Sequence, residues 1–186
     1  MSSLKLYMVL LGCRPGNRLT EQHDIFFGIA GSMKELIPAI IACWPEAKGK
    51  MHVDAWREVN YVDGYKVTIS ERGISEHVNN AALFFINLGG YKQNEFDEFH
   101  YKMLLACADK AEAIKRSKQT AFYKHTGFKG ANSHIDDKYG VDVDDIHEIQ
   151  DILPAGAKSA YQVLLEPVDT EITDPIQLGY FPLHKL

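Results

Sequence analysis

The chain has 186 residues, of which 46% are hydrophobic and 24% are charged. A chain of this size can bury a full core in one domain or in two fused halves, so the composition excludes a disordered protein. The net charge of -5, with no basic cluster longer than Lys115-Arg116, argues against a nucleic-acid partner. No apolar run reaches the ~18 residues that a membrane helix needs, so we expect no membrane partner.

The three cysteines, Cys13, Cys43 and Cys107, are widely spaced and lie in apolar surroundings. An odd number without CxxC spacing is typical of reduced thiols rather than of a disulfide framework. Leu10-Leu11-Gly12-Cys13 is similar to a lipoprotein cleavage box, but the apolar run before it is short and returns in mid-chain, where no signal peptide can lie. We therefore expect a cytoplasmic protein.

The first third of the chain predicts two strands and a helix. Leu6–Leu11 is a continuous apolar run ended by glycine, the pattern of a strand covered on both faces. A polar loop leads to His23–Ala30, whose aromatic and β-branched residues predict a second strand. The sequence Ser32-x-x-Glu35 is a capping box and predicts a helix start. Pro38 should kink or shorten this helix because it removes one backbone donor.

After the helix, Met51–Val59 and Gly64–Ser70 predict two strands joined through the turn signal Val62-Asp63-Gly64. Near the end of the chain, Pro154–Ser159 closes the second unit described below, and Tyr161–Val168 predicts an added strand. The tail that follows is too apolar to float freely and should pack on the body or on a partner chain.

The same pattern occurs a second time along the chain. Residues 83–88, 100–107 and the capping box Asp109-x-x-Glu112 repeat the first copy at a shift of 77 residues. His52-Val53-Asp54, Val59 and Asp63 return as His134-Ile135-Asp136, Val141 and Asp145 at a shift of 82, which places the added residues between Ile114 and His134. Ile135–Val141 and Ile146–Ile152 are then the last two strands of the second copy.

The repeat predicts a ββαββ unit used twice, that is, an α+β protein with helices packed on sheet and an approximate two-fold axis. The expected boundaries are 1–76 for the first repeat, 77–156 for the second, and 157–186 for a C-terminal strand and tail packed on the body. A homo-oligomer is left open.

These motifs resemble the bacterial family called domain of unknown function 1543. The resemblance covers about residues 4–153 and rests on Leu11-Gly12 with Glu21-Gln22-His23-Asp24, on His52-Val53-Asp54, and on Asn87-Leu88-Gly89-Gly90 with Glu98-Phe99-His100. Cys13 departs from the pattern, since a second glycine is usual there, as at Gly90. The resemblance implies two tandem copies and a bacterial origin, and it implies no particular activity.

The candidate site residues are polar positions that occur in both copies. Residues i and i+2 of a strand project to the same face, so each His-x-Asp pair presents an imidazole beside a carboxylate. Such pairs serve as a general base, as part of a ligand site, or as a structural hydrogen bond. The ligand-binding candidates are Glu21, His23, His52, Asp54, Glu98, His100, His134, Asp136, Asn17 and Asn94.

No cofactor is predicted, and a divalent metal is the alternative. Two His, one carboxylate sets are available in His23, His52 and Asp54, and in His100, His134 and Asp136. No P-loop, GxSxG, GxGxxG or HExxH motif accompanies them. We therefore expect a small-molecule-binding module with two related His/Asp/Glu sites; the alternatives are a metal-assisted hydrolase or lyase, and an interaction protein whose histidines are scaffolding. Whether the protein is an enzyme is left open.

Overall fold

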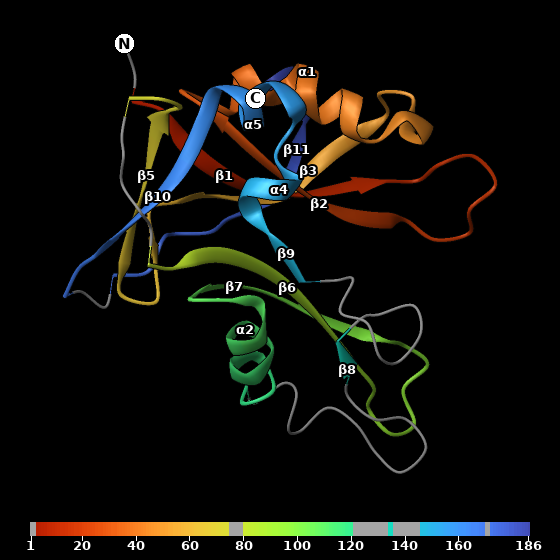
Figure 1. Cartoon of the computed structure of the whole chain (residues 1–186). Helices are drawn as coiled ribbons and strands as arrows, with labels where there is room; N and C mark the ends of the chain where they lie inside the picture. The colour runs from red at the N-terminus through yellow and green to blue at the C-terminus, as the bar shows by residue number, and fades with distance from the viewer. Residues whose placement is uncertain (1–2, 75–79, 121–133, 136–145, 170–171) are drawn as a thin grey trace. The chain divides into compact units, whose positions relative to one another are not determined.

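A computed structural model describes residues 3–74, 80–120, 134–135, 146–169 and 172–186, without the side chains of 134–135. It has three sheets and few helices, so the predicted α+β class is confirmed. The chain divides into two compact units (Figure 1): Met1–His77 with Ile152–Leu186, and Val78–Asp151. No helix in the described ranges is long and apolar enough to cross a membrane.

The main sheet of the first unit has four antiparallel strands in the order β11-β3-β1-β2. Their bounds are β1 Lys5–Cys13, β2 Gln22–Ala30, β3 Met51–Val59 and β11 Gln177–Pro182. The three longer strands lie where the sequence predicts them. The fourth comes from the apolar tail, which pairs with β3 (Figure 1).

The register of this sheet places a glycine between two histidines. Gly12 on β1 lies opposite His23 on β2 and opposite His52 on β3. The β1–β3 register shifts between Leu10 and Leu11, which leaves Asp54 as an extra residue on β3. Such a bulge bends the strand and re-aims its side chains.

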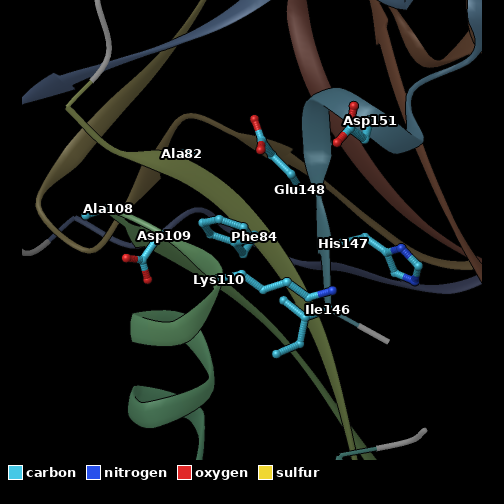
Figure 2. A pocket seen from close by; sticks show the side chains of 9 residues that line it. All are labelled: Ala82, Phe84, Ala108, Asp109, Lys110, Ile146, His147, Glu148 and Asp151. Atoms are coloured by element: carbon cyan, nitrogen blue, oxygen red, sulfur yellow. The ribbon is translucent and has the colours of Figure 1, made fainter. Parts of the chain in front are cut away.

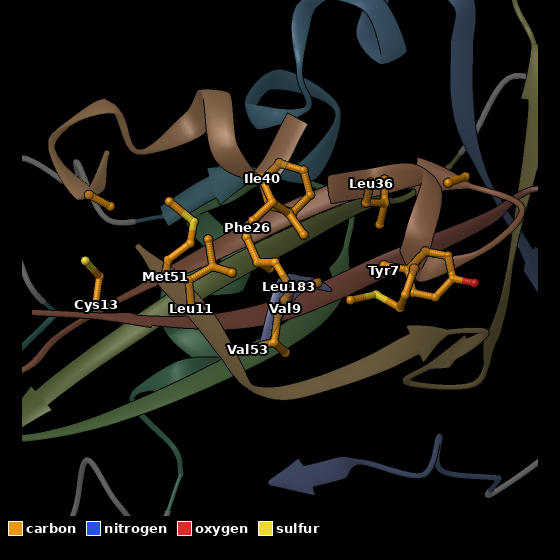
Figure 3. Close-up of a cluster of buried hydrophobic side chains, with 13 residues drawn as sticks. Tyr7, Val9, Leu11, Cys13, Phe26, Leu36, Ile40, Met51, Val53 and Leu183 are labelled. Carbon is orange, nitrogen blue, oxygen red and sulfur yellow. The ribbon is translucent and has the colours of Figure 1, made fainter. Parts of the chain in front are cut away.

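One face of the sheet is covered by α1, which spans Met33–Cys43 and continues through Pro38, so the proline does not end it. Alternate strand residues such as Leu11 and Val53 pack with Leu36 and Ile40 of the helix (Figure 3). The short η1 (Pro45–Ala47) follows α1, and η2 (Leu183–Lys185) closes the chain. Because side chains alternate along a strand, the intervening residues face away from α1.

A second sheet of the first unit has the order β10-β5-β4, with β4 Tyr61–Val62, β5 Tyr65–Glu71 and β10 Tyr161–Pro167. The predicted turn at residues 62–64 and the added strand at 161–168 are confirmed. The expected hairpin between residues 51–59 and 64–70 is wrong, because β5 pairs with β4 and β10 rather than with β3.

The chain passes from one sheet to the other at Asn60, where the buried carboxylate of Asp174 accepts hydrogen bonds from the backbone amides. Asp174 Oδ2 accepts from the amides of Asn60 at 2.7 Å and Tyr61 at 3.0 Å, and Oδ1 accepts from Asn60 Nδ2 at 3.0 Å. These bonds replace the ladder hydrogen bonds that a continuous strand would make. The separation of β4 from β3 therefore depends on a residue more than a hundred positions away.

The sheet of the second unit is built on β6 (Ala82–Gly90), with β7 (Phe99–Cys107) on one side and the short strands β8 (His134–Ile135) and β9 (Ile146–Glu148) on the other. Helix α2 (Lys110–Ser117) packs on this sheet over Phe84, Ile86 and Leu105. Its capping box is confirmed: Asp109 accepts from the amide of Glu112 at 2.8 Å. The box of α1 differs, since the Ser32 side chain makes no bond to the helix backbone.

The end of the second unit departs from the sequence prediction. Residues 146–152 are not one strand: β9 ends at Glu148 and α4 (Ile149–Ile152) follows, while α5 (Ala155–Ala160) already belongs to the first unit. Val9 on β1 pairs with Trp56, and Ile86, which is the equivalent of Val9 on β6, pairs with Ile146. Far more residues thus separate His134 from Ile146 than His52 from Trp56. Val141 and Asp145, the predicted counterparts of Val59 and Asp63, lie outside the described residues.

Candidate functional site

Four of the predicted residues gather on the first unit, on the sheet face that turns away from α1. His23 is near the start of β2, with Glu21 just before that strand, and His52 and Asp54 stand on β3. The register brings both histidines beside Gly12 on the central strand. A site that includes both His23 and His52 requires them to lie close together, and the structure brings them together.

The four side chains form a closed ring in which imidazoles and carboxylates alternate; we call it the His–carboxylate ring. The Nε2 atom of His52 lies 3.1 Å from Asp54 Oδ1 and 3.3 Å from Glu21 Oε1. The Nε2 atom of His23 lies 3.3 Å from Asp54 Oδ2 and 3.9 Å from Glu21 Oε2. Each carboxylate thus directs one oxygen toward each histidine.

The ring is open on one side and closed on the other. The side chains of His23 and Glu21 are 44% and 43% exposed, Asp54 is 26% exposed, and His52 is only 9% exposed. Solvent therefore reaches His23 and Glu21 directly, while His52 forms the floor of the site.

The ring has more hydrogen-bond acceptors than donors. An imidazole has one Nε2 atom and so offers at most one N–H there, whereas the two carboxylates present four oxygens. Asp54 Oδ2 is fully buried and has no hydrogen-bond partner, although His23 Nε2 is nearby. A buried carboxylate oxygen without a donor costs stability, and such positions in native proteins require an explanation.

Gly12 has no side chain because the ring occupies the space above it. A Cβ at this position would lie 2.4 Å from Asp54 Oδ2 and 2.5 Å from His52 Nε2, distances that real Cβ atoms do not show. The Leu-Gly motif at the end of β1 is therefore explained by close approach of the ring.

Tyr180 on β11 is a site neighbour that the sequence prediction missed. Its ring centroid lies 4.2 Å from that of His52, with an interplanar angle of 35°. The prediction that the tail packs on the body gave no indication of this contact, because nothing in the sequence fixes the register of β11 on β3. Tyr180 is nonetheless 70% exposed.

Two other chemistries gain no support at this site. Among the described residues, no group of three or more His, Cys, Asp or Glu is arranged to hold a metal ion. Cys13 is on the face covered by α1, and burial, followed by the negative charge of Glu21, raises the pKa of its thiol. A neutral buried thiol is a poor nucleophile.

Two of the corresponding residues of the second unit have contacts within the described part of the chain. Glu98 accepts a hydrogen bond from Tyr91 at 2.7 Å, and Nδ1 of His100 lies 3.1 Å from Nδ2 of Asn87. The backbone of His134 pairs with Gly89, as His52 pairs with Gly12. The side chain of His134 and all of Asp136 lie outside the described residues.

The two asparagine candidates occupy turns of the same form. Asn17 has φ 69° and Asn94 has φ 68°, and each is the third residue of a turn closed by a backbone hydrogen bond. Asparagine tolerates this left-handed conformation better than most residues. The turn accounts for both asparagines without a ligand.

The second unit also has a pocket of about 530 Å³ that the sequence prediction missed. Figure 2 shows side chains from β6, the start of α2, and β9 around it. Its apolar part is formed mainly by Phe84 and Ile146, and its polar groups come from Asp109, Lys110, His147, Glu148 and Asp151. None of the predicted site residues lines this pocket.

Comparison with known proteins gives the fold and a domain family. A crystal structure of a protein Il1583 from Idiomarina loihiensis matches with a TM-score of 0.56 and 21% sequence identity, over 97% of each chain. Among curated sequences, none matches the chain. Residues 18–69 match the family model described as Domain of Unknown Function (DUF1543). The predicted family is thus supported over the segment that contains all four members of the His–carboxylate ring.

Proposed function

We propose that the first unit binds a small polar molecule at the His–carboxylate ring. The observation that carries the proposal is the fully buried Asp54 Oδ2, which lacks a hydrogen-bond donor in a ring that is otherwise half open to solvent. A ligand that supplies donors would satisfy this oxygen, whereas a purely structural cluster gains nothing from leaving it unsatisfied.

Stability measurements separate this proposal from a scaffolding role. Asp54→Asn keeps the shape of the side chain and removes its charge. If the ring serves a ligand, the variant should unfold in urea within about 0.5 kcal/mol of the wild type, because binding sites are often poorly optimised for stability. If the ring is scaffolding, loss of the carboxylate should cost about 1–3 kcal/mol. Asp169→Asn, at an exposed carboxylate of the same unit, is the matched control.

Binding is tested by thermal shift with a panel of small amines, polyols and carboxylates. We expect at least one class to stabilise the wild type and Asp169→Asn, and to have no effect on Asp54→Asn. Destabilisation by Asp54→Asn, together with no response of the wild type to any class, would refute the proposal and favour an interaction protein with scaffolding histidines.

A metal-assisted hydrolase or lyase is the competing function. It would require the imidazoles and carboxylates to turn from each other toward a shared ion, since the described side chains form no metal-holding group. Metal analysis of the purified protein tests this alternative. Stoichiometric zinc or manganese that is lost in His52→Ala would favour it over the proposal made here.

We also propose that the chain arose by duplication of one unit and works as a bacterial cytoplasmic protein. The equal registers around Gly12 and Gly89, the two turns with a left-handed asparagine at the third position, and the two capping boxes support the duplication. The cytoplasm is supported by the three cysteines, which are all free. Superposition of the two halves in an experimental structure tests the duplication, which would fail if their strand orders differed.

A further inference from the structure

We infer that the His–carboxylate ring selects a small organic cation, an amine or a guanidine, and that Tyr180 of β11 contacts this cation. The inference rests on the proposed function and specifies its ligand class. It follows from the charge of the ring, from its shortage of donors, and from the aromatic ring that β11 places beside it.

The charge of the ring is negative whenever its imidazoles are neutral. Glu21 and Asp54 contribute two carboxylates, and neither forms an ion pair with a lysine or arginine in the described part of the chain. The histidines are the partners within ion-pair distance. An uncompensated pair of carboxylates in a partly desolvated site favours a cationic ligand and disfavours an anionic one.

The hydrogen-bonding capacity of the ring also matches an ammonium or guanidinium group. Such a group offers at least three N–H donors and no acceptor, which complements a ring with four carboxylate oxygens and two Nε2 atoms. Hydrogen bonds between charged groups are the stronger ones. The exposed Glu21 lies at the entrance and the half-buried Asp54 lies deeper, so a cation meets one carboxylate on entry and the other once bound.

Tyr180 is brought to this face by an irregularity in β11. Leu178 pairs with Ala55 and Phe181 with Val53, so two residues of β11 stand opposite the single bulged residue of β3. Gly179 has φ 152°, a conformation that side chains rarely adopt. Phe181 then packs into the core on the α1 face, while Tyr180 lies against His52 on the ring face.

The exposure of Tyr180 suits a ligand contact. The residue is 70% exposed although its ring lies against His52, so one part of the ring is not in contact with the protein. Aromatic faces attract ammonium and guanidinium ions within ~6 Å. Neighbouring Leu178 is 77% exposed, which gives an alkyl tail on the cation an apolar surface beside the polar site.

The experiment is an NMR titration of the full chain with n-butylammonium chloride, with methylguanidinium chloride, and with n-butanol as the neutral analogue. Both cations should shift the imidazole signals of His23 and His52, and n-butanol at equal concentration should not. Tyr180→Leu should weaken butylammonium binding about two- to fivefold, and Tyr180→Phe should retain it. Glu21→Gln should weaken it at least about fivefold. Tyr101→Leu, at a half-exposed tyrosine of the second unit, should change nothing.

Absence of a shift with both cations would overturn the inference, as would equal shifts with n-butanol. In either case the thermal-shift panel tests the proposed function separately. If a neutral or anionic class of compound stabilises the wild type and Asp54→Asn abolishes this effect, the proposed function is retained. Unchanged affinity in Tyr180→Leu would remove Tyr180 from the site. Stronger imidazole shifts with zinc chloride than with either cation would replace the organic cation by a metal.

Discussion

Gly12→Ala tests the geometry of the ring without removing any of its charged groups. The added Cβ would lie 2.4 Å from Asp54 Oδ2 and 2.5 Å from His52 Nε2, while ordinary contacts begin at 3.4 Å. Both side chains must therefore withdraw by about 1 Å, the size of displacement that overpacking forces on a core. Asp54 can swing outward because it is partly exposed, but His52 is held beneath Tyr180.

We expect Gly12→Ala to lower the free energy of unfolding by about 1–3 kcal/mol and to abolish cation binding. Urea unfolding gives the first quantity, and the histidine NMR signals give the second. Gly16→Ala is the matched control, since a Cβ at Gly16 meets nothing within 4 Å. Equal stability of the two variants, with binding retained in Gly12→Ala, would show that the ring does not stand over Gly12.

Three further predictions concern other parts of the chain. Asp174→Ala should lower the free energy of unfolding by about 3 kcal/mol in urea, because it leaves two backbone amides at the sheet change without an acceptor, and Asp174→Asn should cost less. Asp109→Ala should lower the free energy of unfolding by about 1 kcal/mol because α2 loses its cap, and Ser32→Ala should lower it by less than half as much. Near-equal losses would contradict the difference between the two helix starts. At pH 8 a thiol reagent should modify exposed Cys43 well before buried Cys13, and mass spectrometry of the digested protein gives the order. Because burial raises the pKa of both thiols, both modification rates should rise further as the pH increases.

Local patterns predicted the elements that depend on local physics. The apolar run of β1 and the aromatic, β-branched run of β2 became neighbouring strands, and both capping boxes begin helices. In these segments the local preference for strand or helix agrees with the spacing of the apolar residues that must be buried. Prediction from the sequence fails where residues far away in the chain determine the local structure. The carboxylate of Asp174 binds the backbone at Asn60, where β3 has ended, and β5 pairs with β10, which lies about ninety residues further along the chain.

The candidate site was predictable to the same extent. Strand alternation correctly places His52 and Asp54 together, and the Glu-x-His motif adds the other two members of the ring. The alternating ring itself was not predictable, because it depends on the register of three strands and on the bulge at Asp54. The contact with Tyr180 needs a second irregularity, in β11, that no short motif announces.

The two units carry related residues on strands of different length. In the first unit β3 is continuous from Met51 to Val59 and carries both His52 and Asp54. In the second, the strand at the same register is split into β8 and β9.

Glu98 and His100 have polar partners at positions where the first unit has different residues. Tyr91, which donates to Glu98, stands at the place of Arg14, and Asn87, beside His100, stands at the place of Leu10. Leucine has no polar group, and Arg14 donates through Nε to the backbone carbonyl of Arg18 at 3.2 Å. In the proposed duplication, the second copy has thus provided its own polar partners for these two side chains. The ring of the first unit is the one that the described side chains form, and loss of binding in Gly12→Ala with retention in Gly16→Ala is the outcome that the proposed site requires.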